Sequence, residues 1–386
     1  MNRHSKSFAA IATVGCLLLV SCRSDDKAAT STNAATTTVA AGGETTVATD
    51  APESSTAATD AADTTTAATD AADTTTADTE APAPEAWTVD TDKCADPEAA
   101  TAPIEGEIKI GSAQPLSGTP AVAFSPVKEG MELYLKYAND NNLIPDHTVS
   151  IDIRDDQYDA TQTPNVVSSL IDDNVAMFSG IIGSPNNLAV RDTLNEECIP
   201  QLLSLTGSPA WGDVENYPWL TGALVPYTIE SKIYAKQMKD LGVKTVGLFS
   251  VNNEFGKVYV NGFKEAAAEA GIEIIEEQTI EQAETTPPTN QVGAIAAARP
   301  DAIMAIPLGA QCPTFTKELI NAKAVAGDWN PIVFQTNTCG SRLLISLLAA
   351  GSGDGVYTSS NILDPNDPAN DAAPGVKTFK DAYAAA

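Results

Sequence analysis

Histidine is almost absent from this chain of 386 residues, which contains 2 histidines. One of them, His4, lies in the N-terminal segment described below. The other, His147, stands in a polar turn, so a Ser–His or Cys–His catalytic site would lack a second histidine. Ser184 also lacks the Gly-x-Ser-x-Gly pattern of a nucleophile elbow. We therefore expect no enzymatic activity and no cofactor.

Positive charge is scarce as well, with 22 Lys and Arg against 51 Asp and Glu and a net charge of −29. This balance argues against a nucleic-acid partner or an anionic membrane surface. Cysteine pairs at zinc-site spacing are also lacking, so we expect no metal. Beyond Cys16 and Cys22 an even number of cysteines remains, which in an exported protein suggests disulfides with three possible pairings. These are Cys94, Cys198, Cys312 and Cys339.

A short apolar run at residues 8–20 follows the basic residues Arg3 and Lys6 and is too short for a lasting membrane span. It ends in Leu-Val-Ser-Cys at Cys22, which resembles the lipobox of bacterial lipoproteins. The resemblance implies a lipoprotein signal peptide at residues 1–21 and a lipidated Cys22 whose acyl chains insert into the bilayer. It predicts an extracytoplasmic, lipid-anchored protein at the cell surface or in the periplasm. The alternative is an ordinary secretory signal with an incidental cysteine.

Residues 22–86 consist almost entirely of Ala, Thr, Asp and Ser, and the decapeptide at residues 57–66 is repeated at residues 67–76. Such a composition cannot bury enough apolar surface to offset chain entropy, so we expect a disordered tether. A flexible chain of this length has an end-to-end distance of roughly 40 Å. Glycosylation of its threonines stays open.

Strands and helices alternate after the tether. Residues 107–110 alternate as a short strand does, residues 111–119 form a loop of small and hydroxylated residues, and a helix is expected from Ser125 and Pro126. Two more strands end in similar loops, at residues 183–186 and 204–208. Loops at the carboxyl ends of parallel strands bind ligands in α/β sheets, which makes Ser117 and Thr119 candidates. Simple turn formation is the alternative for this first loop.

The pattern restarts after residues 209–226, with strands expected at 245–250, 272–278, 302–306 and 331–335. Alternation of this kind predicts an α/β protein of two similar lobes, each with a parallel sheet and helices on both faces. We expect the folded domain at residues 87–386, with a first lobe of about 95–225 plus 356–386 and a second lobe of about 226–355. Among the pairings we favour Cys94–Cys198 and Cys312–Cys339, because each bridge then lies within one lobe. The last helix ends in alanines without a cap, so we also expect a truncated C-terminus.

Several motifs occur in order between residues 108 and 256 of the body of the chain, residues 107–386. They are Ile108-Lys-Ile-Gly-Ser-Ala-Gln-Pro-Leu-Ser-Gly118, Asp155-Asp156, Gly180-Ile-Ile-Gly-Ser184, Thr206-Gly-Ser208 and Asn253-Glu-Phe-Gly256. In this order and spacing they resemble the type I periplasmic-binding-protein family, and specifically its branched-chain amino acid (leucine-binding) branch of ABC transporter receptors. The resemblance implies two Rossmann-like lobes with parallel sheets, joined by a crossover hinge, that close on a ligand by hinge motion.

The same resemblance implies a ligand set. Hydroxyls and backbone N–H groups of the first lobe would hold a carboxylate. Phe255 would pack on the ligand or close the cleft, and Phe124 would line the side-chain pocket. Where the amino acid receptors have an acid for the ligand ammonium, this chain has Thr336 and Asn337. Amides, urea-like molecules and other small carboxylates therefore fit as well as an amino acid. The hydroxyl-bearing candidates are Ser117, Ser184, Thr206 and Ser208, and Thr119 adds to them.

The resemblance implies a solute-binding protein that delivers a small-molecule ligand to an ABC permease in the membrane. A ligand sensor coupled to a membrane signalling partner is the alternative, because the same fold serves both roles. An anchored protein that has lost ligand binding is a third possibility, tied to the expected truncation.

Overall fold

The computed structural model describes residues 89–348 and 352–385, all of which belong to one compact unit, Pro82–Ala386. The expected signal peptide at 1–21, the lipidation site at Cys22 and the tether at 22–86 lie outside the described residues. Within the described residues, no helix combines the length and apolar character needed to cross a bilayer.

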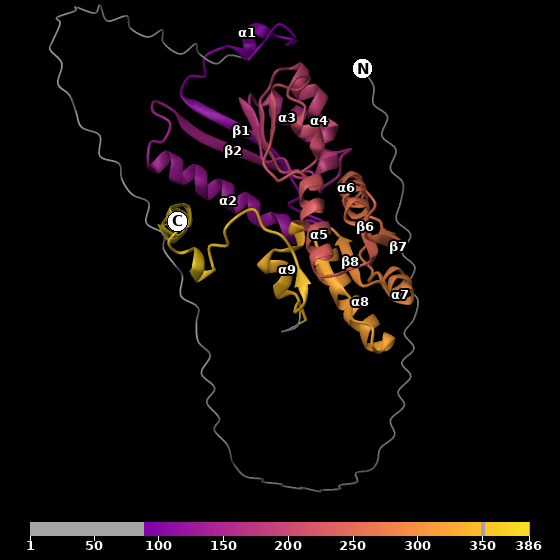
Figure 1. Cartoon of the computed structure of the whole chain (residues 1–386). Helices are drawn as coiled ribbons and strands as arrows, with labels where there is room; N and C mark the ends of the chain where they lie inside the picture. The colour runs from indigo at the N-terminus through magenta and orange to yellow at the C-terminus, as the bar shows by residue number, and fades with distance from the viewer. Residues whose placement is uncertain (1–88, 349–351, 386) are drawn as a thin grey trace, which may run out of the picture. The chain divides into compact units, whose positions relative to one another are not determined.

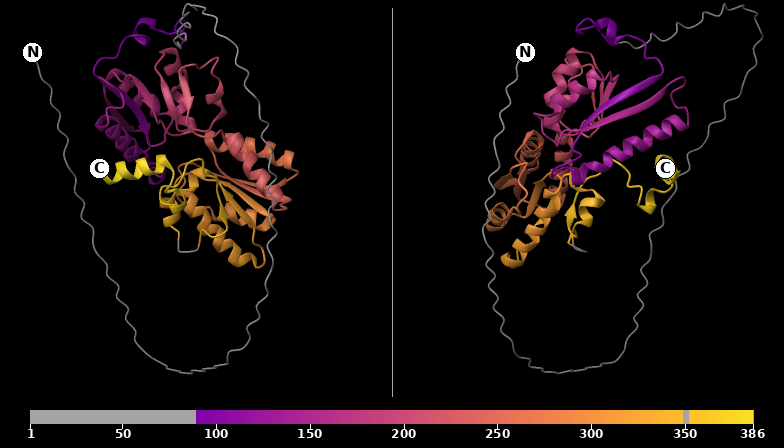
Figure 2. Two further views of the ribbon diagram at one scale, coloured as in Figure 1. Left: turned by 60° about the vertical axis from the view of Figure 1, so that its left-hand side comes forward. Right: turned by 180° about the vertical axis from the view of Figure 1, so that it is seen from behind.

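Two five-stranded sheets form the framework, and the strands within each sheet pair in parallel. This confirms the expected two-lobe α/β fold (Figures 1 and 2). The first sheet has the order β2-β1-β3-β4-β5 and the second β10-β9-β8-β6-β7. The strands of the first lobe are β1 (Glu107–Gln114), β2 (Thr148–Asp155), β3 (Met177–Ser179), β4 (Gln201–Ser204) and β5 (Leu220–Gly222). Those of the second are β6 (Thr245–Val251), β7 (Glu273–Ile280), β8 (Ala302–Ile306), β9 (Ile332–Gln335) and β10 (Val356–Tyr357).

Helices connect the strands, as parallel neighbours require. In the first lobe they are α1 (Pro97–Ala100), α2 (Ala121–Asp140), α3 (Thr163–Asp172) and α4 (Ser184–Glu196), and α5 (Tyr227–Asp240) follows the passage to the second lobe. The second lobe has α6 (Glu254–Ala270), α7 (Thr289–Ala298), α8 (Gln311–Ala326) and α9 (Arg342–Ser346). Single 3-10 turns lie at Pro209–Gly212, Asn337–Cys339 and Pro368–Asn370. The last helix, α10 (Pro374–Ala385), lies against α2.

The helix α2 begins earlier than its sequence indicates. It starts at Ala121, so Pro126 lies inside the helix and the expected start at Ser125 is wrong. Backbone N–H groups of Ala121 and Ala123 already donate to Gly118 and Pro120, at 3.2 and 3.0 Å. These bonds nucleate the helix one turn before Pro126, where proline removes a single intrahelical bond.

The strand β10 pairs with β9, with Val356 opposite Val333. Residues 356–357 therefore belong to the second sheet, and the return to the first lobe comes after Tyr357 instead of at 356. Three short elements, α1, β5 and α9, do not appear among the elements expected from the sequence. Each has five residues or fewer, too few to show a periodicity.

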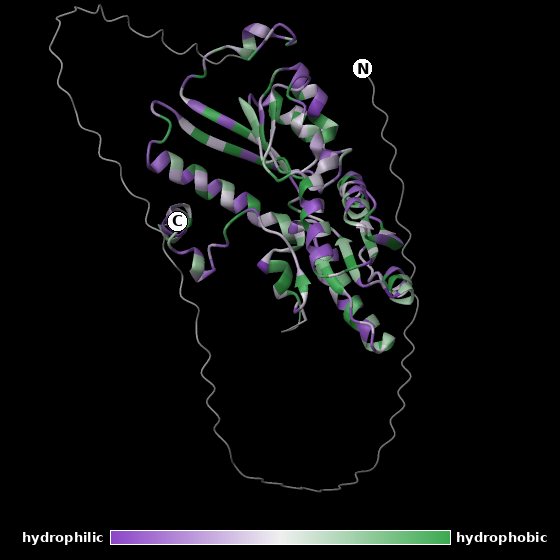
Figure 3. Ribbon diagram, in the orientation of Figure 1, coloured by the Kyte–Doolittle hydropathy of each residue, from purple (hydrophilic) through white to green (hydrophobic). Residues whose placement is uncertain are grey.

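Apolar residues of both sheets make the core. All five residues of β8 are buried, and the rings of Phe249 and Phe315 stack at 4.5 Å beneath the second sheet. Hydrophilic and hydrophobic residues are mixed along β1 and β2 in Figure 3, yet the last five residues of β1 are all buried. The second-lobe core also takes in Tyr158 and Ile182 of the first lobe. Apolar packing is thus continuous between the lobes.

Both favoured disulfides are present, which confirms the pairing. Cys94 and Cys198 lie with Cα atoms 5.4 Å apart, and Cys312 and Cys339 with Cα atoms 5.6 Å apart. The second bridge packs against Leu344 and reaches Val122 of the first lobe. It therefore lies close to where the two lobes meet.

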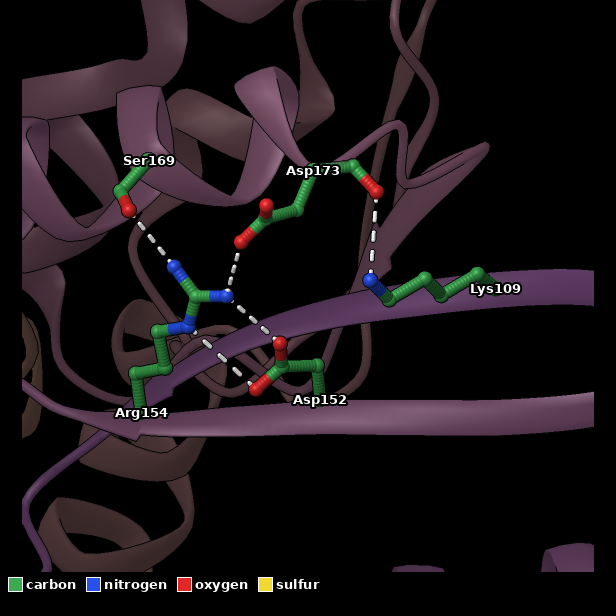
Figure 4. A network of polar contacts seen from close by, with 5 residues as sticks. All are labelled: Lys109, Asp152, Arg154, Ser169 and Asp173. Carbon is green, nitrogen blue, oxygen red and sulfur yellow. Dashed lines mark hydrogen bonds and ion pairs between the residues drawn. The ribbon is translucent and has the colours of Figure 1, made fainter.

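A polar network closes the outer edge of the first sheet (Figure 4). Arg154 on β2 donates to Asp152 at 2.7 Å, to Asp173 at 2.5 Å and to Ser169 at 2.7 Å, and Lys109 on β1 donates to the carbonyl of Asp173 at 3.2 Å. Hydrogen bonds with Arg154 lower the pKa of Asp173. The network is largely solvated, so it fixes the orientation of α3 more than it stabilises the fold.

Candidate functional site

A cavity of about 360 Å³ lies between the lobes, where the carboxyl ends of strands from both sheets converge. We call it the interlobe cavity. Parallel strands direct their carboxyl ends to one edge of each sheet, and the two lobes turn those edges toward each other. Its wall includes Phe124, Tyr158, Gly183 and Leu205 of the first lobe, Leu224 and Tyr227 at the passage, Phe255, Leu308 and Asn337 of the second lobe, and residues 358–362 after β10.

Three of the eight predicted ligand-binding residues line this cavity: Phe124, Phe255 and Asn337. Phe124 stacks on Tyr158 at 6.1 Å between ring centroids. Phe255 is buried and meets the edge of Tyr227 at 5.3 Å. These rings give the cavity an aromatic wall.

Three other predicted residues form a buried hydroxyl cluster beside the wall instead of lining it. Ser184 Oγ lies 2.8 Å from Thr206 Oγ1, and the backbone N–H of Ser208 donates to the same hydroxyl at 3.0 Å. Burial raises the pKa of the Tyr227 phenol, and hydrogen bonds from the Gly207 backbone, Ser184 and Thr206 offset part of the rise. The Tyr227 phenol therefore already contacts the hydroxyls predicted to hold a carboxylate.

The two remaining predicted residues lie away from the interlobe cavity. Ser117 is exposed and its hydroxyl donates to the Asp155 carboxylate at 2.5 Å. The backbone N–H of Leu116 donates to the same carboxylate at 2.9 Å. Thr119 lines a separate hollow of about 270 Å³ beside α8. The structure brings Ser117 to Asp155, which is 38 residues further along the chain.

The Asp155–Asp156 pair builds the turn that carries Tyr158. Gln157 and Tyr158 both have left-handed backbones, with φ of 55° and 61°. Their N–H groups donate to Asp155 Oδ1 at 2.9 Å and to Asp156 Oδ1 at 3.0 Å. Burial raises the pKa of Asp156, and hydrogen bonds from Tyr158, Thr163 and Asn186 offset part of that rise. The acidic pair therefore stabilises a strained turn, and its carboxylates have structural partners.

Gly183 completes this side of the wall. Its φ is +105°, and a Cβ atom there would lie 2.6 Å from the Tyr158 ring and 2.7 Å from Asn186 Oδ1. Only glycine fits this conformation and this space. The helix α4 begins at the next residue, Ser184, so the positive end of its dipole lies beside the cavity.

No charged side chain lines the interlobe cavity among the residues that the structure describes. Buried carboxylates contact the wall from behind: Asp156 Oδ1 accepts from Tyr158 N at 3.0 Å, and Glu230 Oε1 accepts from Asn337 N and from Ser359 Oγ, both at 2.9 Å. His147 lies elsewhere, on an exposed turn 3.1 Å from the Gly106 carbonyl. Within 89–348 and 352–385, no three His, Cys, Asp or Glu side chains gather as metal ligands. The cavity is suited to holding a small molecule, chiefly by apolar and aromatic contact.

Tyr158 and Tyr227 are the aromatic wall residues that were not predicted from the sequence. Tyr227 is the first residue of α5, where the sequence indicates only a helix start. Tyr158 follows an acidic pair and shows no periodic pattern, and its left-handed backbone is invisible in the sequence. An aromatic residue two positions after the Asp155-Asp156 pair is the one signal available for it.

Comparisons with known proteins agree with this arrangement. A family model described as periplasmic binding protein matches residues 107–386. A search of curated proteins found no match.

Solved structures share the fold at low sequence identity. An extracellular ligand-binding receptor from Rhodopseudomonas palustris HaA2 aligns at 23% identity over 72% of this chain and 74% of its own, with a TM-score of 0.60. An ABC transporter solute-binding protein from R. palustris in complex with benzoate aligns at 19% identity over 72% and 74%, with a TM-score of 0.63. A possible leucine/isoleucine/valine-binding protein from Rhodopirellula baltica SH 1 aligns at 19% over 73% and 75%, with a TM-score of 0.61.

Proposed function

Because the chain belongs to the periplasmic binding protein family, we propose that it is the extracytoplasmic solute-binding protein of an ABC importer. It captures a small ligand in the interlobe cavity and delivers it to a membrane permease. The lipobox-like sequence ending at Cys22 supports attachment to the membrane by acyl chains, with residues 22–86 as the tether.

The ligand class follows from the uncharged wall with its four aromatic rings, which is the observation that carries this proposal. The ammonium group of a bound amino acid would find no carboxylate in the wall, and an unpaired buried charge costs several kcal/mol. A ligand carboxylate is more favourable than an ammonium group, because the positive N-terminal end of α4 and the hydroxyl cluster lie beside the cavity and stabilise negative charge. A small aromatic or apolar monocarboxylate, or a related amide, fits better than a branched-chain amino acid. The fold relative that is complexed with benzoate is consistent with this class.

Thermal unfolding of the full chain with benzoate, valine and isobutyramide tests the proposal. A ligand at 100 times its dissociation constant stabilises the folded state by about 2.7 kcal/mol, which gives a measurable shift in melting temperature. We expect a shift with benzoate or isobutyramide and none with valine. A shift with valine alone would reject the ligand class in favour of an amino acid, and no shift with any of the three would reject both classes.

The variant Asn337→Asp places a carboxylate in the wall, where an amino acid receptor needs one. We expect it to weaken benzoate binding by charge repulsion and to improve valine binding by pairing the ammonium group. Asn142→Asp adds the same charge on an exposed turn and serves as the control. Equal behaviour of the two variants would show that residue 337 does not contact the ligand.

A further inference from the structure

One hydrogen bond, made by a single side chain, joins the ligand wall of the first lobe to the second lobe. Gln282 follows β7, and its Nε2 donates to the backbone carbonyl of Tyr158 at 2.9 Å. Among the residues that the structure describes, no other hydrogen bond links residues 107–222 to residues 245–335. Closure of the lobes at this side therefore has one polar contact, made by Gln282.

Other side chains of the second lobe hold the Gln282 amide in place. Gln282 Oε1 accepts from Asn253 Nδ2 at 2.8 Å, and Asn253 also caps α6 by accepting from Gly256 N at 3.0 Å. The backbone after β7 is held in turn by Gln311 Nε2, which donates to the Glu281 carbonyl at 2.9 Å. The amide of Gln282 is thus oriented by the second lobe before it meets the first.

The acceptor is held just as firmly on the other side. The Tyr158 carbonyl belongs to the left-handed turn whose N–H groups donate to Asp155 and Asp156. The ring of the same residue lines the interlobe cavity and stacks on Phe124. One residue therefore contacts the ligand space with its ring and the opposite lobe with its backbone.

We propose that Gln282 is a positioning residue for ligand binding, which fixes the Tyr158 ring against the cavity by holding its carbonyl when the lobes are closed. The part of this proposal that concerns ligand affinity rests on the proposed binding function. A ligand that packs on the Tyr158 ring favours the turn geometry that Gln282 binds, so ligand capture and lobe closure are coupled through this residue.

Two variants of the full chain test the proposal, with a matched control. Gln282→Ala removes the donor, and Gln282→Glu keeps the acceptor for Asn253 but places a carboxylate oxygen against the Tyr158 carbonyl. Gln278→Ala is the control, because Gln278 lies on β7 with similar half-burial and donates to Glu276 within its own strand at 2.6 Å. The loss of one neutral hydrogen bond corresponds to about a fivefold change in an equilibrium constant.

Hydrogen exchange without ligand gives the first readout. We expect amides 157–159 to exchange about fivefold faster in Gln282→Ala, faster still in Gln282→Glu, and unchanged in Gln278→Ala. Calorimetric titration with benzoate gives the second, where we expect affinity to fall about fivefold in Gln282→Ala while the melting temperature stays within about 2 °C of wild type.

The two readouts separate the two proposals. Wild-type exchange rates in both Gln282 variants would overturn the positioning role, whatever ligand binds. Failure of the wild-type chain to bind benzoate would count against the proposed ligand class and leave the exchange result to decide the role of Gln282. Faster exchange together with unchanged benzoate affinity would overturn the coupling to ligand capture.

Discussion

Replacement of Glu230 by alanine removes the acceptor at which three chain segments meet. Oε1 of this buried carboxylate accepts from Tyr234 OH on α5 at 2.6 Å, from Asn337 N after β9 at 2.9 Å and from Ser359 Oγ after β10 at 2.9 Å. Both Asn337 and Ser359 line the interlobe cavity. Glu230 therefore supports the passage between the lobes and the cavity wall together.

The size of the destabilisation depends on which hydrogen-bond partners each donor keeps when Glu230 is replaced by alanine. Without Glu230, the single proton of Tyr234 OH can go to the Gln335 carbonyl, 3.0 Å away, and Ser359 Oγ lies 3.0 Å from Tyr234 OH, so these two groups keep partners. The N–H of Asn337 has no second partner among the described contacts, and a buried orphan donor costs about 1–3 kcal/mol. With the charge-assisted bonds lost, we expect Glu230→Ala to destabilise the fold by about 3–5 kcal/mol.

Glu230→Gln separates the acceptor from the charge. The amide keeps an oxygen for Asn337 N and places an NH₂ group at Oε2, which has no partner in the structure, near Tyr259, whose hydroxyl also has none. It also removes the cost of burying a charge, so we expect a change of about 1 kcal/mol or less. The two variants should differ by about 3 kcal/mol, or roughly 6–12 °C in melting temperature.

Guanidinium unfolding of the two Glu230 variants measures this difference. Asp240→Ala at the end of the same helix is the control, because its ion pair with Lys236 is solvent-exposed and contributes about 0.5 kcal/mol or less. Equal destabilisation by Glu230→Gln and Glu230→Ala would refute the reasoning, since the negative charge would then hold the junction instead of the acceptor geometry.

Two further changes probe the site from the first lobe. Gly183→Ala should cost about 2–4 kcal/mol and abolish the thermal shift with benzoate, because the new methyl group meets the Tyr158 ring in a left-handed backbone, whereas Gly130→Ala in α2 meets open space and should not destabilise. Burial raises the pKa of Asp155, but hydrogen bonds from Ser117 and three backbone N–H groups lower it further, so the net pKa is depressed. This stabilisation is present above the ordinary carboxyl pKa and lost as the pH falls through the depressed value. The unfolding free energies of wild type and Asp155→Asn should therefore differ by about 1 kcal/mol at pH 7 and converge only once the pH lies below that depressed pKa.

The framework of the fold was predictable because buried strands appear in the sequence as short runs of apolar residues. Residues 302–306 are expected and observed as a strand, since an apolar run of that length flanked by proline has few alternatives. The disulfide pairing was predictable once the chain was divided into lobes, because Cys312 and Cys339 fall in the same one. The start of α2 was not, since Ser125 and Pro126 carry a strong local signal that earlier backbone bonds override.

The candidate site was less predictable because its geometry depends on contacts that are distant in sequence. Ser117 reads as a ligand contact from its loop, but Asp155 binds its hydroxyl in the folded chain. Ser184 and Thr206 face each other, and the phenol of Tyr227 contacts both. Their ligand roles stay predictions, which the benzoate experiments address.

The negative charge nearest to Asn337 and Ser359 lies behind the wall of the interlobe cavity, on Glu230. The wall itself carries no charged side chain, yet Glu230 holds two of its residues from behind. An acid in the wall would attract an ammonium group and repel a carboxylate, whereas an acid whose Oε1 already accepts three hydrogen bonds exerts a smaller field on the cavity. Oε2 of Glu230 is the exception, because it is buried without a partner, so Glu230→Gln should also raise the affinity for benzoate if that residual charge reaches the ligand.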